Sequence, residues 1–172
     1  MAWIPSYLIS LGFTQSQMGW LTSLYWLGSL LGTALGSYLS DVIFGGRRRP
    51  PILLSNAMGA ILQVLWLFFL QSYLGLVPVY LVAIGFCLSL GLACYAPLVM
   101  GASSPSHFPV LMGLVATFGA VGGFLGPLSV GRLYDLFQSY TPGFAIFILS
   151  NVLIIVVIGL LREPQIQAKE EP

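Results

Sequence analysis

The chain has 172 residues, of which 58% are hydrophobic and only 6% are charged, and its mean hydropathy is +0.95. A soluble domain is about one quarter charged, so this chain has too few charges to cover a soluble surface. The net charge of +1 provides no basic face that could bind nucleic acid. The composition therefore predicts an integral membrane protein and excludes a soluble domain and a nucleic-acid-binding protein.

The first segment, MAWIPSYLISLGFTQSQ (residues 1–17), has too few apolar residues before the polar TQSQ to span a membrane. It has neither a basic N-terminal region nor a small-residue cleavage site, so it is not a signal peptide. We interpret it as the end of a transmembrane helix whose start lies upstream. The chain is then expected to be a fragment or a truncated gene product.

Five segments without Lys, Arg, Asp or Glu follow in chain order: 16–40, 51–71, 75–102, 110–130 and 143–161. Each has close to or more than the roughly 20 residues that cross the hydrocarbon core as a helix. No period-two alternation typical of membrane strands appears. The expected fold is all-α and integral to the membrane, with five complete transmembrane helices plus the end of a sixth in residues 1–161. Residues 162–172, REPQIQAKEEP, are expected to form a polar, disordered tail.

The basic residues predict the orientation, because cytoplasmic loops collect Lys and Arg. If Arg47, Arg48 and Arg49 are cytoplasmic, the alternating spans place the loop 103–107 and the tail on the same side. Five of the six basic residues are then cytoplasmic, and only Arg132 is outside. The sequence thus predicts a multi-pass protein of the cell membrane, plasma or inner, with a cytoplasmic C-terminus.

Asp41 stands at the predicted end of the first complete helix, where the helix dipole disfavours an acid. A cationic partner or a neighbouring helix N-terminus would explain its position. Arg47, Arg48 and Arg49 can reach it across VIFGG, whose glycines permit a tight turn. These arginines are at least topological anchors. Together with Asp41 they could also form a conformational latch that holds one cytoplasmic arrangement of helices.

The stretch GSYLSDVIFGGRRRP (36–50) resembles the glycine–aspartate–arginine loop of major facilitator superfamily transporters. The match uses Gly36, Asp41, Gly46 and the arginines of the basic cluster. It departs from the commonest form, because no basic residue follows Asp41 and the gap to the arginines is longer. Residues 112–137 resemble the eleventh helix of the same superfamily.

The longer gap, with Phe44 in it, and WIPSYL (3–8) are similar to the organophosphate:phosphate antiporter branch. The resemblance implies that the chain holds helices seven, in part, to twelve, which form one half of a transporter. It also implies a missing N-terminal half as partner, and a small-molecule solute, such as an organic anion or phosphate ester, moved by alternating access. The phosphate-binding arginines of that branch lie on the first and seventh helices, outside this chain.

Glycines repeat at helical spacing in two of the predicted spans, where small residues let helices approach closely in lipid. The superfamily resemblance implies that these two spans correspond to helices eight and eleven. Their glycine faces would then slide against the missing half of the transporter. Static packing is the alternative. The residues are Gly28, Gly32 and Gly36 in the first span, and Gly119, Gly122, Gly123 and Gly126 in the fourth.

Polar and aromatic residues at mid-membrane depth are candidates for contact with a solute, although most such residues bond to other helices. They are Tyr25, Trp26, Asn56, Gln63, Tyr80, Tyr95 and Asn151. The superfamily resemblance implies a cavity lined by its first, fourth, seventh and tenth helices. It therefore favours Tyr95 and its helix neighbours Ser89 and Cys94 as solute-cavity residues, and Tyr25 is added to them from the mid-membrane candidates.

Other chemistry is sparse. Cys87 and Cys94 lie about 10 Å apart along one helix, too far for a disulfide, and His107 alone cannot form a metal site. Ser104, Ser106 and His107 share one loop without the glycine pattern of a nucleophile elbow, so we expect no enzyme, cofactor or metal. Two function classes remain: a secondary transporter, and a non-transporting membrane subunit, scaffold or decayed transporter half.

Overall fold

A computed structural model describes residues 3–70 and 73–161 of the chain. The described residues form α-helices joined by short π- and 3-10 turns, and none of them is in a strand. The helices are α1 (Ile4–Ser10), α2 (Gln15–Tyr38), α3 (Arg49–Leu65), α4 (Val77–Ser89), α5 (Tyr95–Gly101), α6 (Phe108–Phe137) and α7 (Thr141–Leu160). The turns are η1 (Leu39–Ile43), η2 (Trp66–Leu70), η3 (Leu74–Leu76) and η4 (Leu92–Cys94).

Sequence signals for helix starts explain where most of these helices begin. Proline occupies the first turn of α1, α3, α4, α6 and α7, where its missing N–H costs nothing. Helix α2 begins instead with a capping box, in which Thr14 accepts from the Gln17 backbone N–H and the Gln17 side chain accepts from Thr14. Helix α6 ends at Gln138, which is in the left-handed region at φ 50°.

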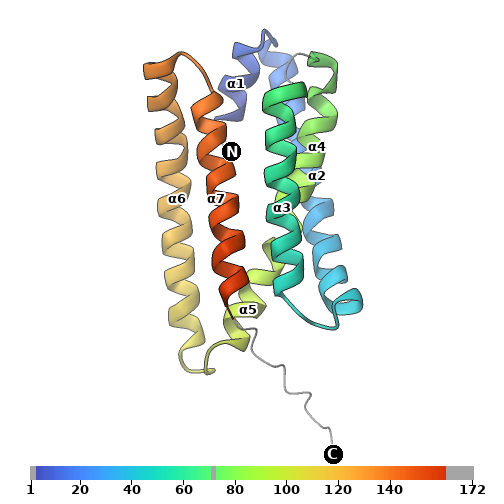
Figure 1. Ribbon diagram of the computed structural model, residues 1–172, viewed down its shortest axis with the longest axis vertical. Coiled ribbons are helices and arrows are strands. Elements are labelled where there is room, and N and C mark those ends of the chain that lie inside the picture. The colour runs from blue at the N-terminus through green and yellow to red at the C-terminus, as the bar shows by residue number, and fades with distance from the viewer. Residues whose placement is uncertain (1–2, 71–72, 162–172) are drawn as a thin grey trace, which may run out of the picture.

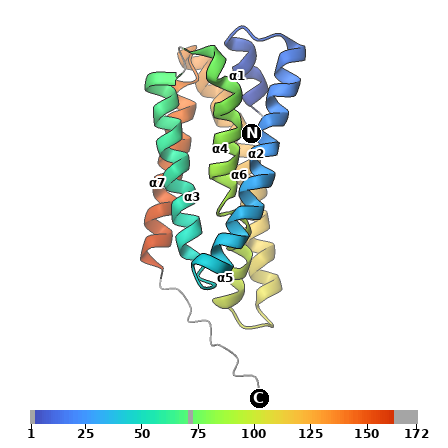
Figure 2. The same ribbon diagram turned by 90° about the vertical axis from the view of Figure 1, so that its right-hand side faces the viewer.

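The long helices run side by side along the long axis of the molecule (Figure 1). The turn between α2 and α3, helix α5 and the end of α7 lie at one end, and α1 and the α6–α7 turn lie at the other (Figures 1 and 2). The Asp41–Arg49 segment and the α5–α6 loop therefore share one face, as the alternating spans predicted. The predicted tail, 162–172, lies outside the described residues.

Four helical segments of the described chain are long and apolar enough to cross a membrane by length and composition. They are Arg49–Phe69, Leu74–Gly101, Phe108–Phe137 and Thr141–Leu160. Together with the all-helical structure they confirm the fold class. The fifth expected span is α2, whose 24 residues measure about 36 Å but which is not among the four. The count of five complete spans thus stays a prediction.

The span 75–102 is interrupted before Pro97. Helix α4 ends at Ser89, and the chain passes through a turn and η4 before α5 begins at Tyr95. Pro127, by contrast, lies inside α6 and does not interrupt it. The span that contains Pro97 is therefore divided, whereas α6 accommodates its internal proline.

Most of the core lies where α1 meets α2, α3, α4 and α7. One cluster contains Ile4, Tyr7, Leu8, Leu21, Tyr25, Trp66, Val77, Tyr80, Leu81, Ile84 and Phe144. A smaller one near the Asp41 end contains Ile52, Cys94 and Ile158. Helix α6 lies at the edge of the bundle beside α7 (Figure 1), and Val130 is its one buried residue.

Candidate functional site

The turn that carries Asp41 is built by a change of helix type followed by two glycines. Helix α2 widens into the π-turn η1, in which the Phe44 N–H bonds the Leu39 carbonyl. Gly45 and Gly46 then adopt φ values of 58° and 79°, a conformation that costs glycine little. The chain reverses direction at these glycines, and the Gly46 N–H donates a hydrogen bond to the Ser40 carbonyl at 2.8 Å.

Arg48 is the arginine that pairs with Asp41. Its Nη1 donates both to Asp41 Oδ1 and to Ser40 Oγ, the latter at 2.8 Å. Ser40 is fully buried and donates in turn to the Arg47 carbonyl at 3.0 Å. The Asp41 side chain is 59% exposed, so the pair contributes only about 0–1 kcal/mol in water.

Arg49 extends to a different helix. Its Nε donates to the Ile158 carbonyl at 3.0 Å and its Nη2 to the Gly159 carbonyl at 2.7 Å. These carbonyls belong to the last turn of α7, where backbone acceptors lack helical partners and the dipole favours a cation. Arg47 is exposed and has no ion pair or side-chain hydrogen bond within the described ranges. The three arginines therefore do not act as one cluster on Asp41.

Replacing Arg49 with Gln is expected to lower the free energy of unfolding by about 1–2 kcal/mol, because two charge-assisted bonds to the end of α7 are lost. Thermal unfolding of the 172-residue chain in detergent would measure the loss. Arg47→Gln is the matched control, since it removes the same charge from an exposed position. Equal melting temperatures for the two variants would contradict the helix-capping role of Arg49.

Helices α2 and α4 touch backbone to backbone. A Cβ added to Gly28, Gly32 or Gly36 would overlap the carbonyl oxygens of Val82, Phe86 and Leu90 respectively. Next to these contacts, Ser29 Oγ and Ser89 Oγ lie 2.6 Å apart across the same interface. The spacing of small residues therefore produces close helix packing, as expected from the sequence.

The glycine face of α2 packs against α4, whereas the resemblance implied that it contacts a missing half of the transporter. Gly28, Gly32 and Gly36 are buried against α4 of the same chain, so this face is already occupied and is not free for the expected contact with a further half. The position of these glycines thus favours static packing over sliding. In α6, by contrast, Gly119, Gly122, Gly123 and Gly126 have no described atom outside their own helix backbone within 4 Å of an added Cβ. Only this second face is open.

The four expected solute-cavity residues do not lie around one cavity. Tyr25 is buried in the larger core cluster, and Ser89 is bonded to Ser29 between α2 and α4. Cys94 belongs to the smaller cluster, and Tyr95 packs against that cluster from α5. Contact of these four residues with a solute therefore stays a prediction.

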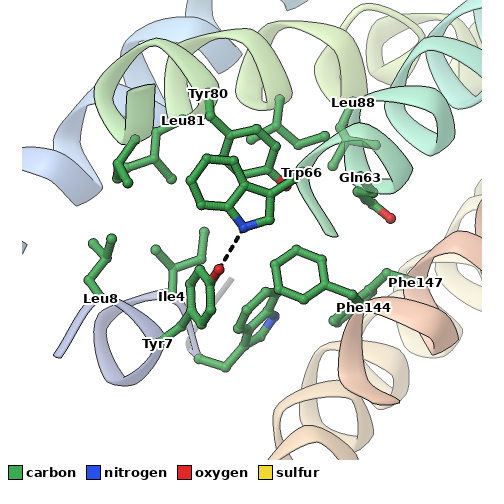
Figure 3. A pocket seen from close by; sticks show the side chains of 13 residues that line it. Ile4, Tyr7, Leu8, Gln63, Trp66, Tyr80, Leu81, Leu88, Phe144 and Phe147 are labelled. Carbon is green, nitrogen blue, oxygen red and sulfur yellow. Dashed lines mark hydrogen bonds between the residues drawn. The ribbon is translucent and has the colours of Figure 1, made fainter. Parts of the chain in front are cut away.

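An aromatic cavity of about 60 Å³ instead lies between α1, α3, α4 and α7 (Figure 3). Trp66 stacks on Tyr80 with ring centroids 4.1 Å apart, and its Nε1 donates to the Tyr7 hydroxyl at 2.6 Å. Phe144 and Phe147 enter from α7 and Gln63 from α3 (Figure 3). Gln63 and Tyr80 were named among the mid-membrane candidates, but Tyr7, Trp66 and the phenylalanines were not. Their only sequence signal was aromatic content, which does not reveal which helices meet.

The loop between α5 and α6 holds a small polar cluster. Ser104 Oγ lies 2.7 Å from His107 Nδ1 and 3.1 Å from Ser106 Oγ, and all three residues are exposed. Ser104 thus hydrogen-bonds to the other two side chains at the protein surface, where water competes for the same hydrogen bonds. No group of three or more His, Cys, Asp or Glu that could hold a metal occurs in residues 3–70 and 73–161.

Comparison with known proteins gives one match. The family model described as Major Facilitator Superfamily matches residues 1–172. No curated protein and no solved structure matches the chain.

Proposed function

The chain belongs to the major facilitator superfamily, and we propose that it forms the C-terminal half of a secondary transporter that works by alternating access. Members of this family carry small solutes across membranes. The observation that carries the proposal is the family match over the whole chain, together with the four apolar spans. Residues 1–161 would be the membrane half-domain, incomplete at its N-terminus.

The proposed solute is a small organic anion or phosphate ester. The support is the similarity of the long Asp41–Arg47 gap, with Phe44 in it, and of WIPSYL to the organophosphate:phosphate antiporter branch. A half that contributes only part of the solute path also needs a partner half, because transporter sites lie between two repeats near the bilayer midplane. We place the protein in the cell membrane with Asp41, the arginines and the C-terminus on the cytoplasmic side.

The open face of α6 is the proposed contact with the missing half. Its glycines have space beside them, while the glycines of α2 are already covered by α4. The DNA upstream of the first codon tests this organisation directly. A reading frame that continues into a second six-helix segment with its own Asp–Arg loop is the expected result. A stop codon immediately upstream would favour the non-transporting subunit.

Within the transporter, Asp41 and Arg48 are the proposed latch. Their ion pair ties η1 to the start of α3, so it stabilises the access state in which these groups meet. Asp41→Asn and Arg48→Gln in the complete transporter should each lower turnover by about two- to fivefold, because a contact of about 1 kcal/mol or less is lost. The solute concentration at half-maximal rate should stay unchanged.

Initial-rate uptake over a range of solute concentrations measures both quantities. Arg47→Gln is the control, because this exposed arginine has no described ion pair. Topology must first be checked by labelling from each side, since each arginine also contributes to orientation. Weaker apparent affinity with normal turnover would show that these residues contact solute and do not form a latch.

A further inference from the structure

A polar pocket lies at the end of the bundle where α1 meets the turn between α6 and α7 (Figure 1). It has a volume of about 230 Å³, and we name it the tyrosine pocket after Tyr7, Tyr134 and Tyr140 in its lining. All of its described lining residues except Leu67 and Phe144 carry a hydroxyl or an amide group, and none of them is charged. The pocket is therefore distinct in chemistry from the aromatic cavity, which is lined mainly by aromatic and aliphatic side chains.

The three tyrosine rings are held in place by one another. Tyr140 lies between the other two, with its ring centroid 5.2 Å from that of Tyr7 and 4.5 Å from that of Tyr134. Phe144 packs on Tyr7 with its centroid 5.4 Å away. Because these rings are already ordered, little side-chain freedom is lost when a ligand binds. A tyrosine offers an apolar ring face and a hydroxyl, which together suit a carbon frame that carries hydroxyl groups.

The turn after α6 fixes the hydrogen-bonding groups of the tyrosine pocket. Gln138 directs the chain from α6 toward α7 at φ 50°, a conformation uncommon for residues other than glycine. Ser139 donates to the Thr141 hydroxyl at 3.1 Å and accepts from the Thr141 N–H at 3.2 Å, so the Thr141 hydroxyl keeps its own proton. Ser10 donates to the Tyr7 carbonyl at 2.7 Å and keeps its acceptor positions. The lining thus offers both donors and acceptors.

Size and charge limit the ligand. A volume of about 230 Å³ is the share of roughly seven to eight water molecules in the liquid, which is enough for one sugar ring or a glycerol group. No described lining residue could neutralise a carboxylate or a phosphate. A purely apolar ligand would displace water from the hydroxyl and amide groups without replacing its hydrogen bonds. An uncharged group with several hydroxyls meets both conditions.

We propose that the tyrosine pocket binds an uncharged, hydroxyl-rich group, which is either a free sugar or the sugar or glycerol headgroup of a lipid. The pocket lies where the apolar segments of α6 and α7 end, so both a dissolved molecule and a lipid headgroup can reach it. Its described lining belongs entirely to this chain, and the site is separate from a solute path between two halves. A bound ligand connects α1 to the α6–α7 turn.

Saturation-transfer nuclear magnetic resonance tests the proposal on the 172-residue chain in phosphatidylcholine nanodiscs prepared without sugar-based detergent. Titrated methyl β-glucoside should give a saturable signal. Tyr140→Phe and Thr141→Val each remove one hydroxyl while keeping the shape of the side chain, and each should weaken binding about three- to tenfold. Tyr38→Phe, at an exposed position outside the pocket, is the control and should leave binding unchanged. Absence of a saturable signal, or equal binding by all four proteins, would overturn the proposal.

Two competitors identify the source and the charge of the ligand. Monoglucosyl diacylglycerol in the nanodisc should displace methyl β-glucoside if a lipid headgroup enters the pocket, and should leave it bound if only a free sugar does. Either result supports a site for hydroxyl-rich groups. Glucose 6-phosphate should bind more weakly than methyl β-glucoside, because no described lining residue is cationic. Tighter binding of the phosphate ester would overturn the proposal, and none of these measurements depends on transport.

Discussion

Replacing Gly32 with leucine is expected to unfold the α2–α4 contact and to lower the free energy of unfolding by about 3 kcal/mol or more. A Cβ at this position would overlap the Phe86 carbonyl, and backbone cannot move aside as a flexible side chain can. The helices must separate, and the Ser29–Ser89 bond at 2.6 Å is lost with the contact. Insertion into the membrane should be unaffected, because leucine favours lipid.

The matched control is Gly122→Leu on α6, where an added Cβ meets no described atom within 4 Å. Thermal unfolding and size-exclusion profiles of both variants in detergent measure the difference. We expect a large fall in melting temperature for Gly32→Leu and almost none for Gly122→Leu. If Gly32→Leu instead keeps its stability and only blocks exchange between access states, measured by cysteine labelling from each side, then the α2 face slides and is not static packing.

The sequence predicted much of the fold, because the physics of a lipid-spanning chain is largely local. Helices of about 20 apolar residues satisfy their own backbone bonds, and proline and glycine mark where they begin and turn. The ion pair expected for Asp41 is present because Arg48 is only seven residues away. Close packing at Gly28, Gly32 and Gly36 was likewise expected from their spacing.

The partners of these groups could not be predicted in the same way. Arg49 bonds carbonyls 109 and 110 residues further along the chain, and no local pattern reveals which helix end lies nearby. The glycines of α2 face α4 of the same chain, whereas the resemblance suggested a contact outside it. The aromatic cavity takes residues from four helices, and no local pattern reveals which helices meet there.

The 172-residue chain by itself is expected to move no solute. A solute path must be enclosed by protein, because polar groups exposed to hydrocarbon are costly. In the described chain α6 is almost entirely exposed, and its glycines have no neighbour beyond their own helix. A transporter of this type places its site between two halves. One half therefore leaves the path open to lipid.

Uptake into liposomes measures whether the chain can transport a solute without a second half. The purified chain is reconstituted at less than one copy per vesicle, beside the same chain joined to its N-terminal half, and radiolabelled organic anions and phosphate esters are screened. We predict saturable uptake by the joined protein and background uptake by the chain alone. Saturable uptake by the single 172-residue chain, abolished by its own denaturation, would contradict the claim that it is half of a transporter.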